Sequence, residues 1–567
     1  MTPFDEHLPF VEMQQSTTLH AWRSNWGDAP QIHRQTHEKA SLALFNRRAT
    51  IAVIGTSHHQ RGAVSMRQGV LPFQYVGERK GEGMTAFAGL GLYLDLLHAA
   101  RLPALADHET SVRDGQGYRD GQMLTALVLL NLAGGDGVRD VEALEQDDGL
   151  CALMRKAERC GLGWKGQRAE QGRWRKARTR TFPSQSAIFR YLEAFHDEAQ
   201  EECRAKVGTP LAFIPAANAA LRGLRRLNQH FVAWVQSVHP EGTATVDMDA
   251  TLIETGKQEA LYGYKGHKAY QPLQVYWAEQ GLLVESEFRD GNVPAGHEQL
   301  RLFQESLAVL PQGVKNAFLR SDTAGYQQEL LLYCGEGKDR RFGVIPFAVG
   351  ADMTAALRGA VGETPKEDWH PLEDSTTGQE WAEVCYVPNW VGHTQREGTY
   401  RYVAVREPVR QSILPGMERQ LPFEALTMED GRAYKVTAVV TNRHLPGAGL
   451  LRWYRGRCGK SEEVHSVLKS DLAGGRMPSG SFGENAAWWA VAVLSANLHA
   501  AAKRLALGEE WAQKRLKAVR YGLITIAGRV VEHGRQMFIQ VRALHPGFAT
   551  LVGGRGSLLA LTASPPG

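Results

Sequence analysis

Hydrophobic positions recur every three to four residues through the first part of the chain, which is the spacing of one buried helix face. This period makes the segment from about residue 80 to residue 160 helical, and it returns after the basic run that follows. A helix start is expected at Pro183 and Ser184, because both residue types favour the first positions of a helix. The helices predicted from this spacing cover residues 84–97, 120–132, 138–153, about 184–196 and 216–235.

The pattern changes to alternation at about residue 243, and alternation predicts strands with two different faces. The predicted strands cover residues 244–248, 269–277, 282–288 and 316–320, and the helices that accompany them cover 297–309 and 326–334. Three strands, a helix, a strand and a helix is the order of an α/β ribonuclease-H-like core, a mixed sheet flanked by helices.

Strands return after this core. Residues 341–442 are strand-rich, with one helix expected near 352–360, and two strongly helical segments follow at 450–472 and 486–505. We therefore expect a β-rich insertion that interrupts the α/β core before its last helices.

Composition indicates a globular protein of several domains. The 567 residues exceed the roughly 250–300 at which single cores stop growing. The longest apolar runs, 123–132 and 486–496, are about half the ~20 residues that span a bilayer. No signal peptide is visible at the start, and six widely spaced cysteines indicate reduced thiols. A cytoplasmic protein is expected.

Charge is unevenly distributed, although the net charge is only +4. Between Arg155 and Arg180 there are ten basic residues against two acids, with Trp164 and Trp174 among them. Such a segment can hold phosphates and offer stacking surfaces to bases, and the alternative is a solvated basic loop. The candidates for DNA contact are Arg173, Arg175, Lys176 and Arg178.

Acidic residues stand at two predicted strand ends. Asp247 and Asp249 share one face of the first strand, because side chains alternate along a strand. Asp322 ends the later strand NAFLRSD. Two such acids can hold Mg²⁺, which prefers oxygen ligands. Taken singly, they are equally compatible with solvent-facing acids and with a helix N-cap.

A third acid lies on the predicted helix 450–472. At 100° per residue, Glu462, His465 and Lys469 form one stripe, opposite the apolar face of that helix. Four further residues near the helix start are candidate phosphate donors: Tyr454, Arg455, Arg457 and Lys460. Alone, this pattern is also that of an ordinary surface helix.

The three acids together are more specific. Polynucleotidyl transferases have this arrangement: two acids that each lie at the end of a strand, and a third acid on a later helix. There, two divalent ions ~4 Å apart activate the attacking oxygen and stabilise the leaving oxygen of an in-line displacement. Three carboxylates neutralise and bridge the ions.

The sequence resembles the DDE-type transposases of bacterial insertion sequences, in particular the family numbered thirteen-eighty. The resembling segments are 115–150, 182–192, 246–273, 288–296, 318–326 and 457–498, in the family's order. The resemblance implies a helical DNA-end-binding region, a ribonuclease-H-like catalytic core and a β-rich insertion before the last acid.

The resemblance also assigns the metal ligands. Asp249 matches the first acid, in the form D-x-T, Asp322 the second and Glu462 the third. The related Tyr-Arg-Glu-Lys signature fits Tyr454, Arg457, Glu462 and Lys469, except that four residues rather than three separate the arginine from the glutamate. Glu463 therefore stays an alternative to Glu462, and Asp247 an alternative to Asp249.

Two lysines between the first two strands, Lys265 and Lys268, are further candidates for DNA contact near the cut, with a polar turn as the alternative. The expected domains are an extension without an assigned role (1–65), a helical DNA-end-binding region (66–240), the first part of the core (241–340), the insertion (341–445), and the second part of the core with the C-terminal region (446–567).

These features predict a transposase that binds the terminal inverted repeats of its element, cleaves at the ends and joins the 3′-hydroxyls to target DNA. We expect two Mg²⁺ ions per site, replaceable by Mn²⁺, a homodimer on DNA, and a bacterial cytoplasmic protein that lies on the nucleoid when bound. The alternatives are an inactive DNA-binding relative and a metal-dependent nuclease without strand transfer.

Overall fold

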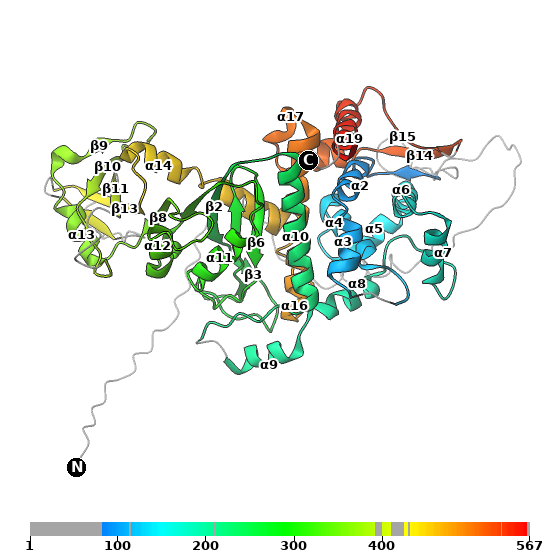
Figure 1. Cartoon of the computed structure of the whole chain (residues 1–567), viewed down its shortest axis with the longest axis horizontal. Coiled ribbons are helices and arrows are strands. Elements are labelled where there is room, and N and C mark those ends of the chain that lie inside the picture. The colour runs from blue at the N-terminus through cyan, green and yellow to red at the C-terminus, as the bar shows by residue number, and fades with distance from the viewer. Residues whose placement is uncertain are drawn as a thin grey trace, which may run out of the picture. The chain divides into compact units, whose positions relative to one another are not determined.

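The computed structural model describes residues 82–112, 115–207, 211–391, 400–409, 424–428, 431–534 and 536–563 (Figure 1). The extension predicted at 1–65 lies outside these residues. No helix within the described ranges combines the length and the apolar character that a bilayer crossing needs.

The first part of the described chain is helical, as its hydrophobic period predicts. Ser184 and Asn218 cap two of these helices, since their side chains accept hydrogen bonds from the amides of Ala187 and Leu221. The helices are α2 (Leu90–Ala99), α3 (Leu102–Glu109), α4 (Asp120–Ala133), α5 (Val141–Glu145), α6 (Asp148–Arg159), α7 (Trp164–Gly172), α8 (Gln185–Leu192), α9 (Glu198–Val207) and α10 (Ala219–Val238).

A mixed sheet follows, and it confirms the predicted α/β core. Its strands are β2 (Thr243–Ala250), β5 (Leu273–Trp277), β6 (Leu282–Glu287), β7 (Asn316–Ser321) and β8 (Phe347–Ala351), in the order β6-β5-β2-β7-β8. The first three are antiparallel neighbours, whereas β2, β7 and β8 run parallel. Helices α11 (Gln299–Val309) and α12 (Gln328–Gly335) flank β7 in sequence, and a short ladder of β3 (Ile253–Glu254) and β4 (Ala269–Tyr270) follows β2.

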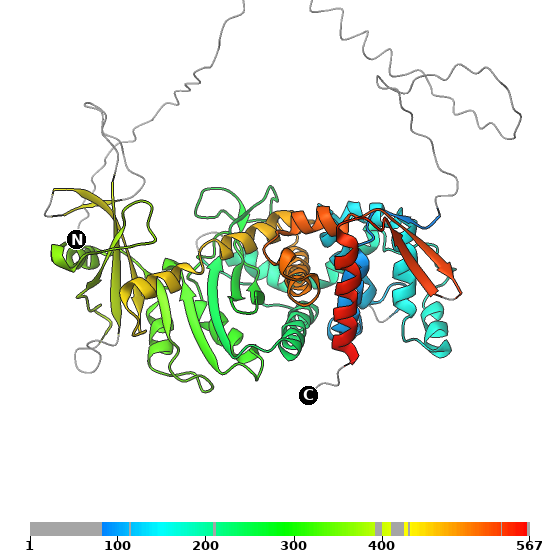
Figure 2. The same cartoon turned by 90° about the horizontal axis from the view of Figure 1, so that it is seen from above.

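The strand-rich segment continues this sheet instead of forming one of its own. Strand β13 (Ala433–Thr441) pairs antiparallel with β8, and the sheet continues through β11 (Arg401–Pro408), β10 (Glu380–Val384) and β9 (His370–Pro371). Strand β12 (Ala425–Thr427) pairs with β13, which brings the sheet to ten strands. The helix expected near 352–360 is α13 (Ala355–Gly362). Figure 2 shows these strands side by side with the core strands.

The single helix predicted over 450–472 is interrupted. Helix α14 (Gly447–Arg455) ends before Gly456, and α15 (Lys460–Ser466) begins after Gly459, whose φ of +77° suits glycine. A π-helical turn (Val467–Asp471) follows. The break was not expected, because apolar spacing continues across it.

Helix α16 (Phe482–Ala502) is buried on all sides, and its Trp488 and Trp489 are each 1% exposed, as core packing predicts. The C-terminal part adds α17 (Glu509–Ala512), α18 (Leu516–Val519), the hairpin of β14 (Gly528–His533) and β15 (Gln536–Val541), and α19 (Gly547–Ala563). Strand β14 also pairs with β1 (Met84–Thr85), a contact between distant ends of the described chain that no local pattern indicates.

Asparagine side chains close the edge of the sheet at β6. Asn497 of α16 accepts a hydrogen bond from the Leu283 amide and donates to the Leu283 carbonyl, both at 2.8 Å. It also donates to Asn228 of α10 at 2.7 Å, and Asn228 donates to the same carbonyl at 2.9 Å. The two helices thereby satisfy the backbone groups of an edge strand, which otherwise offer a site for aggregation.

The stability of the protein at acid pH should depend on His499, which is buried in α16. This side chain is buried against the Tyr93 hydroxyl at 2.9 Å, and burial, with the charges of Lys503 and Arg520, lowers its pKa to about 3. The unfolded state therefore binds a proton that the folded state does not, and stability falls as pH drops below the ordinary value of 6.5. We expect a loss of about 1 kcal/mol between pH 6.5 and about pH 5.5 from this residue.

Urea unfolding across this pH range measures the effect. His499→Asn should lose this part of the pH dependence, because an amide does not titrate there. His108→Asn, at a histidine whose side chain is 84% exposed, should keep it. Identical pH profiles for wild type and His499→Asn would contradict a neutral buried imidazole.

Candidate active site

The two acids of β2 share a face of the strand but have different partners. Asp247 lies directly opposite Arg320 of β7, which donates to its two carboxylate oxygens at 2.6 and 2.7 Å. Both side chains are buried. Because a two-pronged ion pair occupies the Asp247 carboxylate, this residue holds β2 to β7 and is a poor candidate for a metal ligand.

Asp249 lies two residues further along β2, and Asp322 follows the end of β7. Since β2 and β7 are parallel, their carboxyl ends meet at one edge of the sheet. Burial raises the pKa of Asp249 to about 6, against the opposing charge of Arg457, and the negative charge of Asp322 contributes to the rise. Asp322 also caps the turn after β7, since its Oδ1 accepts from the Ala324 amide at 3.1 Å.

Arg457 lies against these acids from the break between α14 and α15. Its Nη2 is 3.5 Å from Oδ2 of Asp249, and its ring neighbour is Tyr454, with 5.9 Å between the guanidinium carbon and the ring centroid. Its side chain is buried, yet its Nε has no hydrogen-bond partner within the described residues. Burial lowers the pKa of Arg457, but Asp249, Tyr454 and Asp322 together raise it, so the guanidinium stays charged beside the acids.

The following helix brings two more bases to this edge. His465 is half-buried, and burial, with the charges of Lys469 and Arg457, lowers its pKa to about 4. The Lys469 ammonium donates to the Leu252 carbonyl at 3.5 Å, just beyond β2. Burial and the charge of Lys265 lower the pKa of Lys469, which places the two lysines near each other.

Glu462 stands apart from Asp249 and Asp322. It is exposed in the first turn of α15, whereas Glu463 is half-buried and pairs with Lys460 at 3.6 Å. In the part of the chain that the structure describes, no three Asp, Glu, His or Cys side chains converge as a metal site requires. The structure thus brings together Asp249, Asp322, Arg457, His465 and Lys469, whereas Glu462 is exposed on α15.

One acid near this edge was missed by the sequence reasoning. Asp352 follows β8, the next parallel strand, and burial together with the charge of Asp322 raises its pKa. The signal was present as the strand FGVIPFAV followed closely by an acid, but that strand was placed in the insertion. Three neighbouring parallel strands therefore each carry an acid at or near the carboxyl end.

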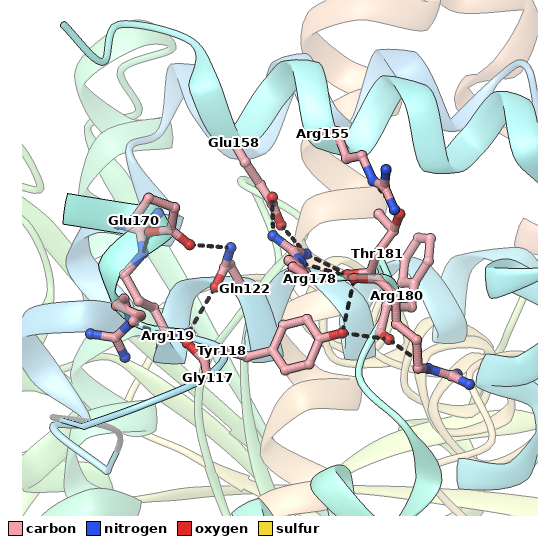
Figure 3. A network of polar contacts seen from close by, with 12 residues as sticks. Gly117, Tyr118, Arg119, Gln122, Arg155, Glu158, Glu170, Arg178, Arg180 and Thr181 are labelled. Atoms are coloured by element: carbon pink, nitrogen blue, oxygen red, sulfur yellow. Dashed lines mark hydrogen bonds and ion pairs between the residues drawn. The ribbon is translucent and has the colours of Figure 1, made fainter. Parts of the chain in front are cut away.

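The basic segment 155–180 is partly an internal network (Figure 3). Arg178 donates to both Glu158 oxygens at 2.6 and 3.0 Å, and its guanidinium carbon lies 5.0 Å from the Tyr118 ring and 5.3 Å from the Trp174 ring. Arg180 donates to both oxygens of Glu142 at 2.9 Å. These arginines hold the loop against α5 and α6.

Other cations of the same segment face outward. Lys176 is exposed, as are Lys165 and Arg168 on α7, and Trp164 at the start of α7 is 68% exposed. Arg173 donates to the Gly117 carbonyl and Arg175 to the Gln116 side chain, so both are attached to the neighbouring loop.

The remaining predicted bases have partners within the protein. Arg455 donates to Gln379 at 2.7 Å, and Lys268 donates to the Gln258 carbonyl. That these residues contact DNA stays a prediction, as it does for the outward-facing cations of segment 155–180.

Comparison with models of protein families assigns the chain to a family. The model of the transposase DDE domain, group 1, matches residues 77–553, so the chain belongs to this family of transposases, which are enzymes that act on DNA. Among solved structures, it is similar to piggyBac transposase in a synaptic complex with hairpin DNA, at 10% identity and a TM-score of 0.37, covering 79% of this chain and 82% of that one. No curated protein matches.

Substitution should separate the two acids of β2. Asp247→Ala leaves Arg320 buried without its partner, so we expect the free energy of unfolding to fall by about 3–5 kcal/mol. Asp249→Ala removes a carboxylate whose charge burial disfavours and a longer contact of 3.5 Å with Arg457, which keeps the charge of Asp322 nearby, so the loss should be much smaller. Urea denaturation measures both, and equal losses would contradict the distinction.

Proposed function

We propose that this transposase binds the terminal inverted repeats of a bacterial insertion sequence of the family numbered thirteen-eighty, cleaves a phosphodiester at each end and joins the 3′-hydroxyls to target DNA. The observation that carries the proposal is the meeting of Asp249 and Asp322 at the carboxyl ends of β2 and β7, with the buried Arg457 beside them. We propose that the mixed sheet around them is a ribonuclease-H-like core.

The acids fit divalent ions. Two carboxylates that disfavour each other's charge are stabilised by a cation between them, and Mg²⁺ is commonly held by one or two carboxylates together with waters and substrate phosphates. Asp249 and Asp322 would hold Mg²⁺ or Mn²⁺, and Glu462 would complete the site for two ions when DNA is held. Bound ions would polarise the phosphodiester and activate the attacking oxygen.

The bases around the acids have a separate task. Arg457 can present its unpartnered Nε to a phosphate oxygen, and a buried guanidinium does so more strongly than an exposed one. His465 is neutral at pH 7, so it offers a donor or acceptor without adding charge. Lys469 and Lys265 then hold flanking phosphates, because the two lysines repel each other in the free protein and a phosphate would supply a counter-charge.

End recognition would lie further away, on the outward cations of segment 155–180, with Trp164 as a stacking surface. Two element ends must be cut and joined together, so a homodimer on DNA and a cut-and-paste route are part of the proposal. The element's own repeats are expected to flank the gene.

Cleavage should depend on the acids. With a terminal-repeat duplex and Mg²⁺ or Mn²⁺, wild type should give end cleavage and joined products, and Asp249→Ala, Asp322→Ala and Glu462→Ala should each reduce cleavage by at least about 10³-fold. Glu463→Ala serves as the matched control at the adjacent acid and should stay near wild type. Gel analysis of labelled ends measures both steps.

The outcomes are distinct. Binding of the repeat without any cleavage by wild type would indicate an inactive DNA-binding relative, and cleavage without joined products would indicate a nuclease. Cleavage that survives Asp322→Ala would contradict the site, and loss with Glu463→Ala but not with Glu462→Ala would reassign the third acid.

Salt dependence should separate the outward lysine from the inward arginine. Lys176→Ala should leave stability unchanged, weaken repeat binding and lower the slope of log affinity against log salt by about 1. Arg178→Ala should instead lower the free energy of unfolding by about 2 kcal/mol, because Glu158 loses a charged hydrogen-bond partner. The same salt slope for Lys176→Ala and wild type would contradict a phosphate contact.

A further inference from the structure

Gln274 of β5 is buried next to the acids without a hydrogen-bond partner. Gln274 is only 2% exposed, and neither its Nε2 nor its Oε1 has a hydrogen-bond partner in the described ranges. Among the buried glutamines that the structure describes, Gln274 alone has both amide atoms fully enclosed and without a partner. Such groups are rare in folded proteins, because burial removes their bonds to water.

The register of the sheet places Gln274 beside Asp249. The two residues are direct partners in the antiparallel pairing of β2 and β5, and side chains of opposite residues lie on the same face with Cβ atoms about 4.5–5.5 Å apart. The neighbouring pair, Asp247 and Tyr276, also lies close together. Burial and the charges of Asp247 and Glu463 raise the pKa of Tyr276 to about 12.

This face lies beneath the segment that carries the bases. Glu463 belongs to α15, and its charge reaches Tyr276, so α15 lies near this part of the sheet. Arg457, just before α15, contacts Asp249. Gln274 therefore belongs to a layer of polar side chains on β2 and β5, of which Asp247 is fully paired and Gln274 is not.

We propose that Gln274 is a positioning residue for Asp249 and supplies a hydrogen-bond donor to its carboxylate, or to water held by it, when a divalent cation is bound. The inference rests on the proposed function, because it assumes that Asp249 holds the cation. A carboxylate that binds a metal through one oxygen is oriented by hydrogen bonds to the other, and such supporting partners tune metal affinity. The cost of an unpartnered amide is then present only in the metal-free protein.

One substitution at Gln274 should change stability and metal affinity in opposite directions. Gln274→Met keeps the length of the side chain but removes the amide. Without metal, the melting temperature should rise by about 1–3 °C, because a buried polar group without a partner is gone. The affinity for Mn²⁺, measured by electron paramagnetic resonance in the presence of terminal-repeat DNA, should fall at least about tenfold.

Gln236→Met is the matched control. Gln236 is also buried, but its Nε2 donates to the Glu241 carbonyl at 2.7 Å and its Oε1 accepts from the Glu241 amide at 3.0 Å. The same substitution there should lower the melting temperature, because bonded backbone groups lose their partner, and leave the Mn²⁺ affinity unchanged.

Three results would overturn the inference in distinguishable ways. If wild type binds no Mn²⁺ with DNA present, the proposed function fails, and this inference fails with it. If wild type binds Mn²⁺ and cleaves, but Gln274→Met binds Mn²⁺ equally well, only the role of Gln274 fails. If Gln274→Met melts below wild type, the amide has a partner in the metal-free protein, which also contradicts the proposal.

Discussion

The parallel pairing of β2 with β7 is the constraint on which the site depends. It aligns Asp247 with Arg320, and this buried ion pair fits only one register. A shift by one residue would turn every side chain of the strand to the other face, so the ion pair would be lost together with the position of Asp249 relative to Asp322. A buried ion pair is weak evidence for stability, but it can specify one arrangement among several.

The polar side chains around this pairing differ in whether they have hydrogen-bond partners within the protein. At the β6 edge, Asn228 and Asn497 satisfy backbone groups and are themselves satisfied. At the carboxyl ends of β2 and β7, by contrast, Asp249 carries a charge that burial disfavours, and the Nε of Arg457 has no hydrogen-bond partner among the described residues. Unfavourable electrostatics gathered at one edge of a sheet is typical of a site that awaits a charged ligand.

Much of this could be predicted from local pattern. Alternation located β2 and β7, and the D-x-T context separated Asp249 from Asp247 before the ion pair with Arg320 gave the physical reason. Apolar spacing could not reveal the break at Gly456 and Gly459, because a positive φ at one glycine leaves the spacing intact. The stripe of Glu462, His465 and Lys469 has an exposed member, a half-buried member and a member on the π-helical turn, which the α-helical period does not reveal.

Contacts between residues far apart in sequence explain the remaining differences between the predictions and the structure. Asp352 was missed because β8 reads like a strand of the insertion, whereas its pairing with β7 makes it part of the core. Arg178 reads like a phosphate contact until its partners Glu158, Tyr118 and Trp174 are known, and of these only Trp174 is close to it in sequence. Gln274 carries no motif, and only the strand register places it opposite Asp249.

The most direct test of the account is anomalous X-ray scattering from crystals of the protein with terminal-repeat DNA and Mn²⁺. The account predicts a peak in ligand contact with both Asp249 and Asp322, with Glu462 turned toward the same ions. A manganese site that excludes Asp249 or Asp322, in a complex that cleaves its DNA, would contradict it.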